Sequence, residues 1–435
     1  MEITEFKRLL DTGLGRAVLY LQEHSADPFR DVILNACLHN MALDRQVEGS
    51  RAAYMLDIIE QTGESKYYRE QILSTLRQLP PELEDYDIEQ LFDFARLFAI
   101  QGNQEARQAI YNKFILNLSS EDFTGAATII ELDGIKGFLF VASHLGEFAL
   151  HDPDFVDDDL FLIMAEEQSG QENVSHALAQ VQTDDPRIAA YMRVVSNSRA
   201  RRERWRAESR TNPSTLSFSE IENSIYSRKT TFARLSTWGQ HASESDLLRA
   251  ARKVQTESDP NSLRRFLGIF RYVRFPLDHQ LLFALSQHAD EQVAIHALNA
   301  LVIITHPEVR AFALDMISMS FRPESFIRLL AKNFQDGDWE FVEHITQQEF
   351  GPEEFHRLGI GVRAIFAEDP NIESIGALMN LYEKGQCANC RVSVVKCLHK
   401  LNAIPQWMVQ ECRRDANFYL RECANKNFEG LGPNW

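Results

Sequence analysis

A spacing of apolar residues that recurs along the chain limits how it can fold more than any other feature. The segments Ser262–Pro276 (SLRRFLGIFRYVRFP) and Val293–Pro307 (VAIHALNALVIITHP) align at a distance of 31 residues, measured from proline to proline. The apolar positions that coincide are Phe266 with Ala297, Leu267 with Leu298, Ile269 with Ala300, Phe270 with Leu301 and Val273 with Ile304. Units that repeat at such a distance bury their apolar faces against each other, so the pattern predicts a stacked array.

Helical spacing of apolar residues continues through most of the 435-residue chain, for example in DVILNACLHNMAL and IEQLFDFARLFAIQG. Alternating strand patterns with Asn-Gly or Asp-Gly turns are scarce. Asp-Pro pairs such as Asp259-Pro260 suit helix starts, because Asp can cap a helix and Pro fits its first turn. The sequence therefore predicts an all-α fold of helices of roughly 10–16 residues joined by short turns.

The segment Lys384–Leu401 (KGQCANCRVSVVKCLHKL) holds three of the six cysteines and one histidine. Val394, Val395, Cys397, Leu398 and Leu401 fall on Ala297, Leu298, Ala300, Leu301 and Ile304 of the repeat. On a helix, His399 would lie on the opposite side from Cys390, whereas a structural zinc site needs four converging ligands. The spacing thus favours reduced cysteines packed between helices, with a metal site as the alternative, and we expect no cofactor.

Two stretches, Asp290–Ile317 and Cys387–Ala424, resemble HEAT or HEAT-like repeats. Each has a first helix with apolar residues at fixed offsets, a turn with a proline, and a second helix, and the arginines at these repeats are Arg310 and Arg391. The resemblance covers Asp259–Phe428. It implies an α-α superhelix, a solenoid of helical hairpins that is elongated and curved, and the functions of such arrays vary widely.

The charge of the chain changes sign twice, although its net charge is −18. The net charge is −19 in Met1–Ser198, +8 in Arg199–Arg274 and −7 in Phe275–Trp435. A polar stretch, Ser196–Ser224, interrupts the helical pattern at the first change. We therefore expect an acidic N-terminal helical array in residues 1–195, a basic and polar connecting segment in residues 196–218, and a C-terminal repeat array in residues 219–435.

The basic middle of the chain supplies the candidate binding residues, here called the basic belt. One interpretation is a solvated helix face that the acidic end regions partly neutralise. The other is an anion-binding site on the inner surface of the array, for nucleic acid, a phosphorylated ligand or an acidic protein. The residues of the belt are Arg199, Arg201, Arg202, Arg204, Trp205, Arg206, Arg249, Arg252, Lys253, Arg264, Arg265, Arg271 and Arg274.

Three consecutive acids, Asp157, Asp158 and Asp159, stand in the acidic N-terminal part. Consecutive side chains point in different directions, and the spaced oxygens of a calcium loop are absent. Acidic residues at a helix start, which interact favourably with the helix dipole, explain them better. The same segment could also fold back onto the basic belt.

Sequence signatures of catalysis are absent: the chain has no GxxxxGK[ST], GxGxxG, GxSxG or HExxH, and its thirteen histidines are scattered. Trp339 with Glu343, and Trp407 with Glu411, each place a ring and a carboxylate on one helix face. In this respect the chain is similar to bacterial alkylpurine DNA glycosylases. The resemblance implies a third, more remote function, that of a DNA glycosylase-like enzyme. That family uses Asp where this chain has Glu. We expect no catalytic and no metal-binding residues.

These observations favour a non-enzymatic interaction protein, a scaffold, adaptor or regulatory subunit that binds a protein partner on a curved surface. Nucleic-acid binding through the basic belt is the alternative. No apolar run approaches the length of a membrane span, and the N-terminus lacks the features of a secretory signal. The sequence thus predicts a cytoplasmic protein without membrane contact.

Overall fold

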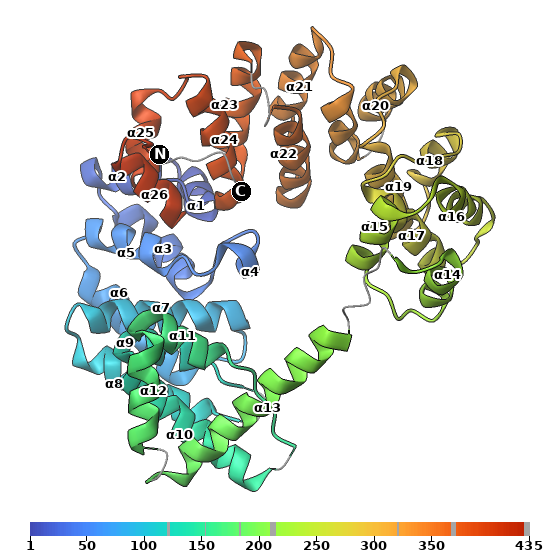
Figure 1. The fold of residues 1–435 in the computed structure, drawn as a ribbon. Coiled ribbons are helices and arrows are strands. Elements are labelled where there is room, and N and C mark those ends of the chain that lie inside the picture. The colour runs from blue at the N-terminus through green and yellow to red at the C-terminus, as the bar shows by residue number, and fades with distance from the viewer. Residues whose placement is uncertain are drawn as a thin grey trace. The chain divides into compact units, whose positions relative to one another are not determined.

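A computed structural model describes residues 1–119, 122–152, 154–181, 184–208, 215–319, 322–366 and 371–429, with the side chains of 205–208 excepted. Within these residues every regular element is a helix, as the sequence predicts (Figure 1). The chain divides into two compact units. Unit 1 comprises Met1–Ala207, Gln386–Asn389 and Pro405–Trp435, and unit 2 comprises Glu208–Gly385 and Cys390–Ile404.

Unit 1 contains the helices of the N-terminal half and two from the C-terminal end. They are α1 (Ile3–Thr12), α2 (Arg16–Glu23), η1 (Asp27–Phe29), α3 (Arg30–Leu38), α4 (Arg45–Glu48), α5 (Ala52–Gln61), α6 (Ser65–Gln78), α7 (Asp85–Ile100), α8 (Gln104–Asn117), α9 (Ala126–Asp133), α10 (Ile135–His151), α11 (Leu160–Ser169), α12 (Gln171–Val181), α13 (Pro186–Glu208), α25 (Gln406–Cys412) and α26 (Phe418–Asn425).

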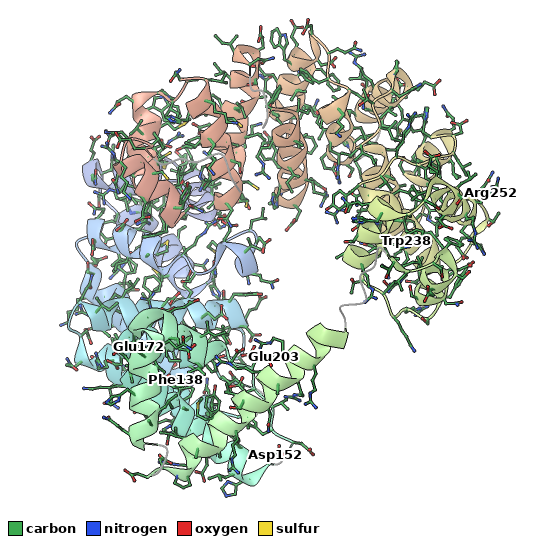
Figure 2. The ribbon with its side chains drawn as sticks, in the orientation of Figure 1. Phe138, Asp152, Glu172, Glu203, Trp238 and Arg252 are labelled. Carbon is green, nitrogen blue, oxygen red and sulfur yellow. The ribbon has the colours of Figure 1, made fainter. Side chains whose placement is uncertain are left out.

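Consecutive helices of unit 1 pack side by side, as α6 does on α7, α7 on α8 and α9 on α10. Their starts follow from local capping. At α7, Glu84 and Asp87 form a reciprocal capping box, and at α8 the side chain of Asn103 accepts a hydrogen bond from the backbone N–H of Ala106. Large rings fill the space between the helices, among them the fully buried Phe138 on α10 (Figure 2).

The two ends of the chain pack together inside unit 1, where Figure 1 shows α25 and α26 beside α1 and α2. The N–H of Ala416 donates to the carbonyl oxygen of Gly13 at 2.8 Å, and Arg421 pairs with Asp57 at 2.9 Å. Gly15 permits this approach, because a Cβ there would lie 2.0 Å from the carbonyl oxygen of Glu411. The last helices therefore complete the packing of the first.

Unit 2 contains the repeats that the sequence analysis aligned. Its helices are α14 (Phe218–Tyr226), α15 (Phe232–His241), α16 (Glu244–Thr256), α17 (Pro260–Gly268), η3 (Ile269–Arg271), α18 (Gln280–Leu285), α19 (Glu291–Leu301), α20 (Pro307–Met319), η4 (Pro323–Ser325), η5 (Ile327–Lys332), α21 (Asp338–Gln347), α22 (Pro352–Phe366), η6 (Ile372–Ser374), α23 (Ile375–Lys384) and α24 (Ala388–Lys400), whose first two residues group with unit 1.

The helices of unit 2 form two layers. One layer contains α15, α17 and α19, with α17 packed between the other two (Figure 1). The second layer contains α16, which packs on α17, and α18, which packs on α19. Asp259 and Asp290 cap α17 and α19 through their side chains, which confirms the expected Asp-led helix starts. The aligned apolar positions on α17, η3, α19 and α24 are buried; they are Phe266, Leu267, Ile269, Phe270, Ala297, Leu298, Ala300, Leu301, Val394, Val395, Cys397 and Leu398.

Two smaller expectations can also be checked. Five of the six cysteines are buried and the sixth is half-buried. None of the helices among the described residues is long and apolar enough to cross a membrane.

Candidate anion-binding site

A group of basic side chains lies on unit 2. The elements that supply them are α17, η3, α19 and η5. Arg264 and Arg265 lie on α17, Arg271 ends η3, His296 lies on α19 and Arg328 on η5. Besides burial, the charge of Arg264 lowers the pKa of Arg265 and His296, and the charge of Arg271 lowers the pKa of His296 and Arg328, which links the five residues into one group. We call these five residues the arginine cluster.

An aromatic contact supports the cluster. The rings of Phe232 on α15 and His296 on α19 stack with centroids 4.3 Å apart. The guanidinium carbons of Arg264 and Arg265 lie 6.0 and 5.6 Å from the Phe232 centroid, within the range of cation–π attraction. Gly268 makes room for this ring, because a Cβ there would lie 2.8 Å from a carbon of Phe232. The aromatic ring thus holds two arginines at the surface of α17.

None of the four arginines of the cluster has a carboxylate partner among the described residues. Arg265 donates one hydrogen bond, from Nη1 to the carbonyl oxygen of Thr230 at 2.6 Å. The buried Nε atoms of Arg264 and Arg265 and the hydroxyl of Thr230 have no hydrogen-bond partner within the described part of the chain. Buried donors are nearly always satisfied in proteins, so this group of donors is suited to an incoming acceptor.

Positive charges in and beside the cluster, together with burial, lower the pKa of His296, Arg265 and Arg328. Burial, followed by the charges of Arg264 and Arg271, lowers the pKa of His296 to about 4. Burial and the charges of Arg264 and Arg228 lower the pKa of Arg265, while burial and Arg271 lower that of Arg328. A bound anion would relieve this repulsion, because an opposite charge nearby favours the charged form of each group.

The α13 part of the basic belt lies in unit 1, and two of its arginines have a carboxylate partner. Arg199 and Arg202 both pair with Asp159, at 2.9 and 2.6 Å, so the acidic segment does fold back onto these residues. Arg201 donates to the hydroxyl of Ser198, and Arg204 to the carbonyl oxygen of Ala200. The remaining two belt residues of α13, Trp205 and Arg206, fall outside the described side chains.

The α16 part of the belt also has partners. Arg249 pairs with Asp246 at 3.2 Å, and Lys253 pairs with Glu222 at 2.5 Å. Arg252 is exposed on α16, at the edge of unit 2 in Figure 2, and Arg274 is exposed beyond η3. The structure therefore brings together only Arg264, Arg265 and Arg271 of the belt, and adds residues outside it.

Phe232, His296 and Arg328 were not predicted from the sequence. A signal for His296 was present, because the 31-residue register that aligns Phe266 with Ala297 also places His296 on Arg265. A cationic or protonatable side chain thus recurs at one repeat position. Arg328 lies on the 3-10 helix η5, which the register does not cover, and only the packing of η5 against α20 and α22 brings it to this layer.

The two ring and carboxylate pairs do not meet in one place within either unit. Trp339 and Glu343 belong to α21 in unit 2, whereas Trp407 and Glu411 belong to α25 in unit 1. Glu411 forms an ion pair with Arg16, whose guanidinium also lies 5.5 Å from the Trp407 ring. The α25 pair therefore helps to join the ends of the chain.

Known proteins offer no comparison: no family model, no curated protein and no solved structure matches the chain.

Proposed function

We propose that the protein is a non-enzymatic interaction protein, a HEAT-like array of helical hairpins, and that unit 2 binds an acidic segment of a partner protein at the arginine cluster. The observation that carries this proposal is the set of four neighbouring arginines without a carboxylate partner among the described residues. Arginine is the side chain best suited to bind carboxylates and phosphates, since its planar fork donates two parallel hydrogen bonds.

The distribution of charge favours a compact acidic segment over nucleic acid. Proteins that bind single-stranded nucleic acid line a positive groove that follows the phosphate backbone over several nucleotides. On α13, Arg199 and Arg202 share Asp159, and on α16, Arg249 and Lys253 pair with Asp246 and Glu222. The arginine cluster instead groups several cations that have no carboxylate partner among the described residues, which suits a short cluster of acidic side chains.

Reversing two charges of the cluster is expected to weaken this binding strongly. The double variant Arg264→Glu with Arg271→Glu should raise the Kd for a fluorescent oligoglutamate peptide about 30-fold or more, which corresponds to about 2 kcal/mol of binding free energy. Fluorescence anisotropy measures the Kd, and circular dichroism verifies that the variant is folded.

A matched control makes the same charge change on α16, with Arg249→Glu and Arg252→Glu, and should bind the peptide nearly as the unchanged protein does. Equal affinities of the cluster variant and the unchanged protein would refute the proposal. A single-stranded oligothymidine that binds more tightly than the peptide, with a steep loss of affinity at higher salt, would assign the cluster to nucleic acid instead.

A further inference from the structure

Two histidines and a glutamate converge at the junction between α18 and α20, away from the arginine cluster. One ligand atom from each of His279, His306 and Glu308 lies within 4.8 Å of the others. Nε2 of His279 is 2.7 Å from Oε2 of Glu308, and the centroids of the two imidazole rings are 4.7 Å apart. The three side chains come from two neighbouring repeats, so the array itself assembles the group.

The backbone that carries these side chains is well held. His279 directly precedes α18, and its ring packs edge-on against Phe283 at 5.1 Å. The N–H of His306 donates to Oδ1 of Asn333 at 2.8 Å, and Nδ2 of Asn333 donates to the carbonyl oxygen of Ile304. Glu308 is the most exposed of the three, with 56% of its side chain accessible. The backbone at both histidines is therefore held in place, while the exposed carboxylate of Glu308 is accessible to solvent.

A simple contact between repeats would not need all three residues. At the next junction the corresponding contact consists of one cation and one acid, Arg310 and Asp338. Here His279 and Glu308 already supply such a pair, and Gln280 gives Glu308 a further hydrogen bond of 3.1 Å. The second imidazole, from His306, is therefore in excess of what the junction requires.

The donor set fits a borderline metal ion. Zinc binds imidazole nitrogen and carboxylate oxygen at about 2.1 Å, which places tetrahedral ligand atoms about 3.4 Å apart. The ligand atoms now lie within 4.8 Å of one another, so binding would require movement of Glu308 and of the rings to reach that separation. Two existing contacts oppose binding, the 2.7 Å contact between Nε2 of His279 and Oε2 of Glu308 and the 3.2 Å hydrogen bond from the N–H of Glu308 to Nδ1 of His306, and losing each costs about 1–3 kcal/mol.

We propose that His279, His306 and Glu308 bind one divalent transition-metal ion of the zinc type, with solvent completing its coordination. Such an ion would join the starts of α18 and α20 and stiffen the array at this junction. The proposal is independent of the function proposed for the arginine cluster.

Metal titration of the full-length protein, freed of metal by chelation, tests this proposal. In isothermal titration calorimetry with zinc, the double variant His279→Asn with His306→Asn should bind one ion fewer, or bind it at least about 100-fold more weakly. Even the loss of a residue that only hydrogen-bonds to a metal ligand weakens metal binding about 10–100-fold. Glu308→Gln should weaken the same event to a smaller extent. The control His241→Asn with His344→Asn removes two exposed histidines of unit 2 and should retain the full stoichiometry.

Cobalt(II) distinguishes this site from the cysteines, since thiolate ligands produce intense near-ultraviolet absorption that nitrogen and oxygen ligands lack. The cobalt spectrum of the unchanged protein minus that of the His279 and His306 variant should contain only the weak visible bands of a site with nitrogen and oxygen ligands. Zinc stoichiometry and affinity in that variant equal to those of the unchanged protein would overturn the proposal, as would a lost spectrum that contains thiolate absorption.

Discussion

Replacing Arg51 by alanine should lower the free energy of unfolding of unit 1 by about 3–5 kcal/mol, the cost of breaking a buried ion pair. The Arg51 side chain is only 4% exposed and pairs with Glu48, itself 3% exposed, at 3.2 Å. Its Nη1 donates to the carbonyl oxygens of Leu10 and Asp11, at 2.9 and 2.6 Å, and its Nη2 to that of Gln386 at 3.4 Å. One guanidinium thus connects three separate segments of unit 1.

The loss is large because alanine leaves the partner charge behind. Glu48 would retain only hydrogen bonds from the N–H groups of Asp44 and Ala388, with no cation to offset its burial. Urea denaturation followed by circular dichroism gives the free energy, and hydrogen–deuterium exchange of α1 and α5 locates the loss in unit 1.

The double variant Arg51→Met with Glu48→Leu is the matched control. Because it removes both charges and retains apolar volume, it should lose far less stability than Arg51→Ala. A loss below about 1 kcal/mol for Arg51→Ala, the usual value for an exposed ion pair, would show that the pair is not buried as the structure has it.

Trp238→Ala should destabilise unit 2 by about 3–5 kcal/mol, the range measured for large aromatic residues removed from cores. Trp238 on α15 (Figure 2) is 1% exposed. The centroids of its ring and of the Phe218 ring are 6.2 Å apart. Its Nε1–H donates to the carbonyl oxygen of Leu216 at 2.8 Å, which anchors the segment before α14. Alanine would leave a cavity and an unsatisfied carbonyl at once.

Trp238→Phe separates these two effects, because it retains most of the ring but no donor. We expect it to cost about 1–2 kcal/mol, for the lost hydrogen bond and a smaller cavity. Exchange of the α14 and α15 amides should accelerate in both variants, and more strongly for alanine. Amide protection in α14 that is unchanged by Trp238→Ala would contradict the anchoring role.

The fold could be predicted because its causes are local and periodic. Helix starts at Asp259 and Asp290 are encoded by one capping side chain each, and both caps are present. The 31-residue register identified the buried faces of α17 and α19, since a repeated unit buries the same positions each time. The packing of Ala416 on Gly13 had no such signal, because nothing periodic links residues so distant in sequence.

The candidate site was only partly predictable for a related reason. Charge counting found Arg264, Arg265 and Arg271 but could not tell paired cations from unpaired ones. The partner of Arg199 is Asp159, which directly precedes α11. The sequence suggested that this acidic segment folds back onto the belt, but not which arginines it pairs. Likewise, His279 and His306 are far apart in the sequence. They converge because successive repeats stack, and the sequence does not show how they stack.

Titration of the His296 imidazole tests the central claim, that the arginine cluster binds an acidic partner, most directly. With carbon-13-labelled histidine, nuclear magnetic resonance should give a pKa of about 4 for His296 in the free protein. Saturation with oligoglutamate should raise this pKa, because the anion offsets the charges of Arg264 and Arg271, while burial, the larger cause of the low pKa, remains. Binding then takes up a proton, so affinity should increase as the pH falls from the pKa of the complex towards about 5, below which the carboxylates of the peptide, with an ordinary pKa of about 4.3, become protonated. A His296 pKa that stays unchanged at saturation, while the exposed His241 responds instead, would contradict the account.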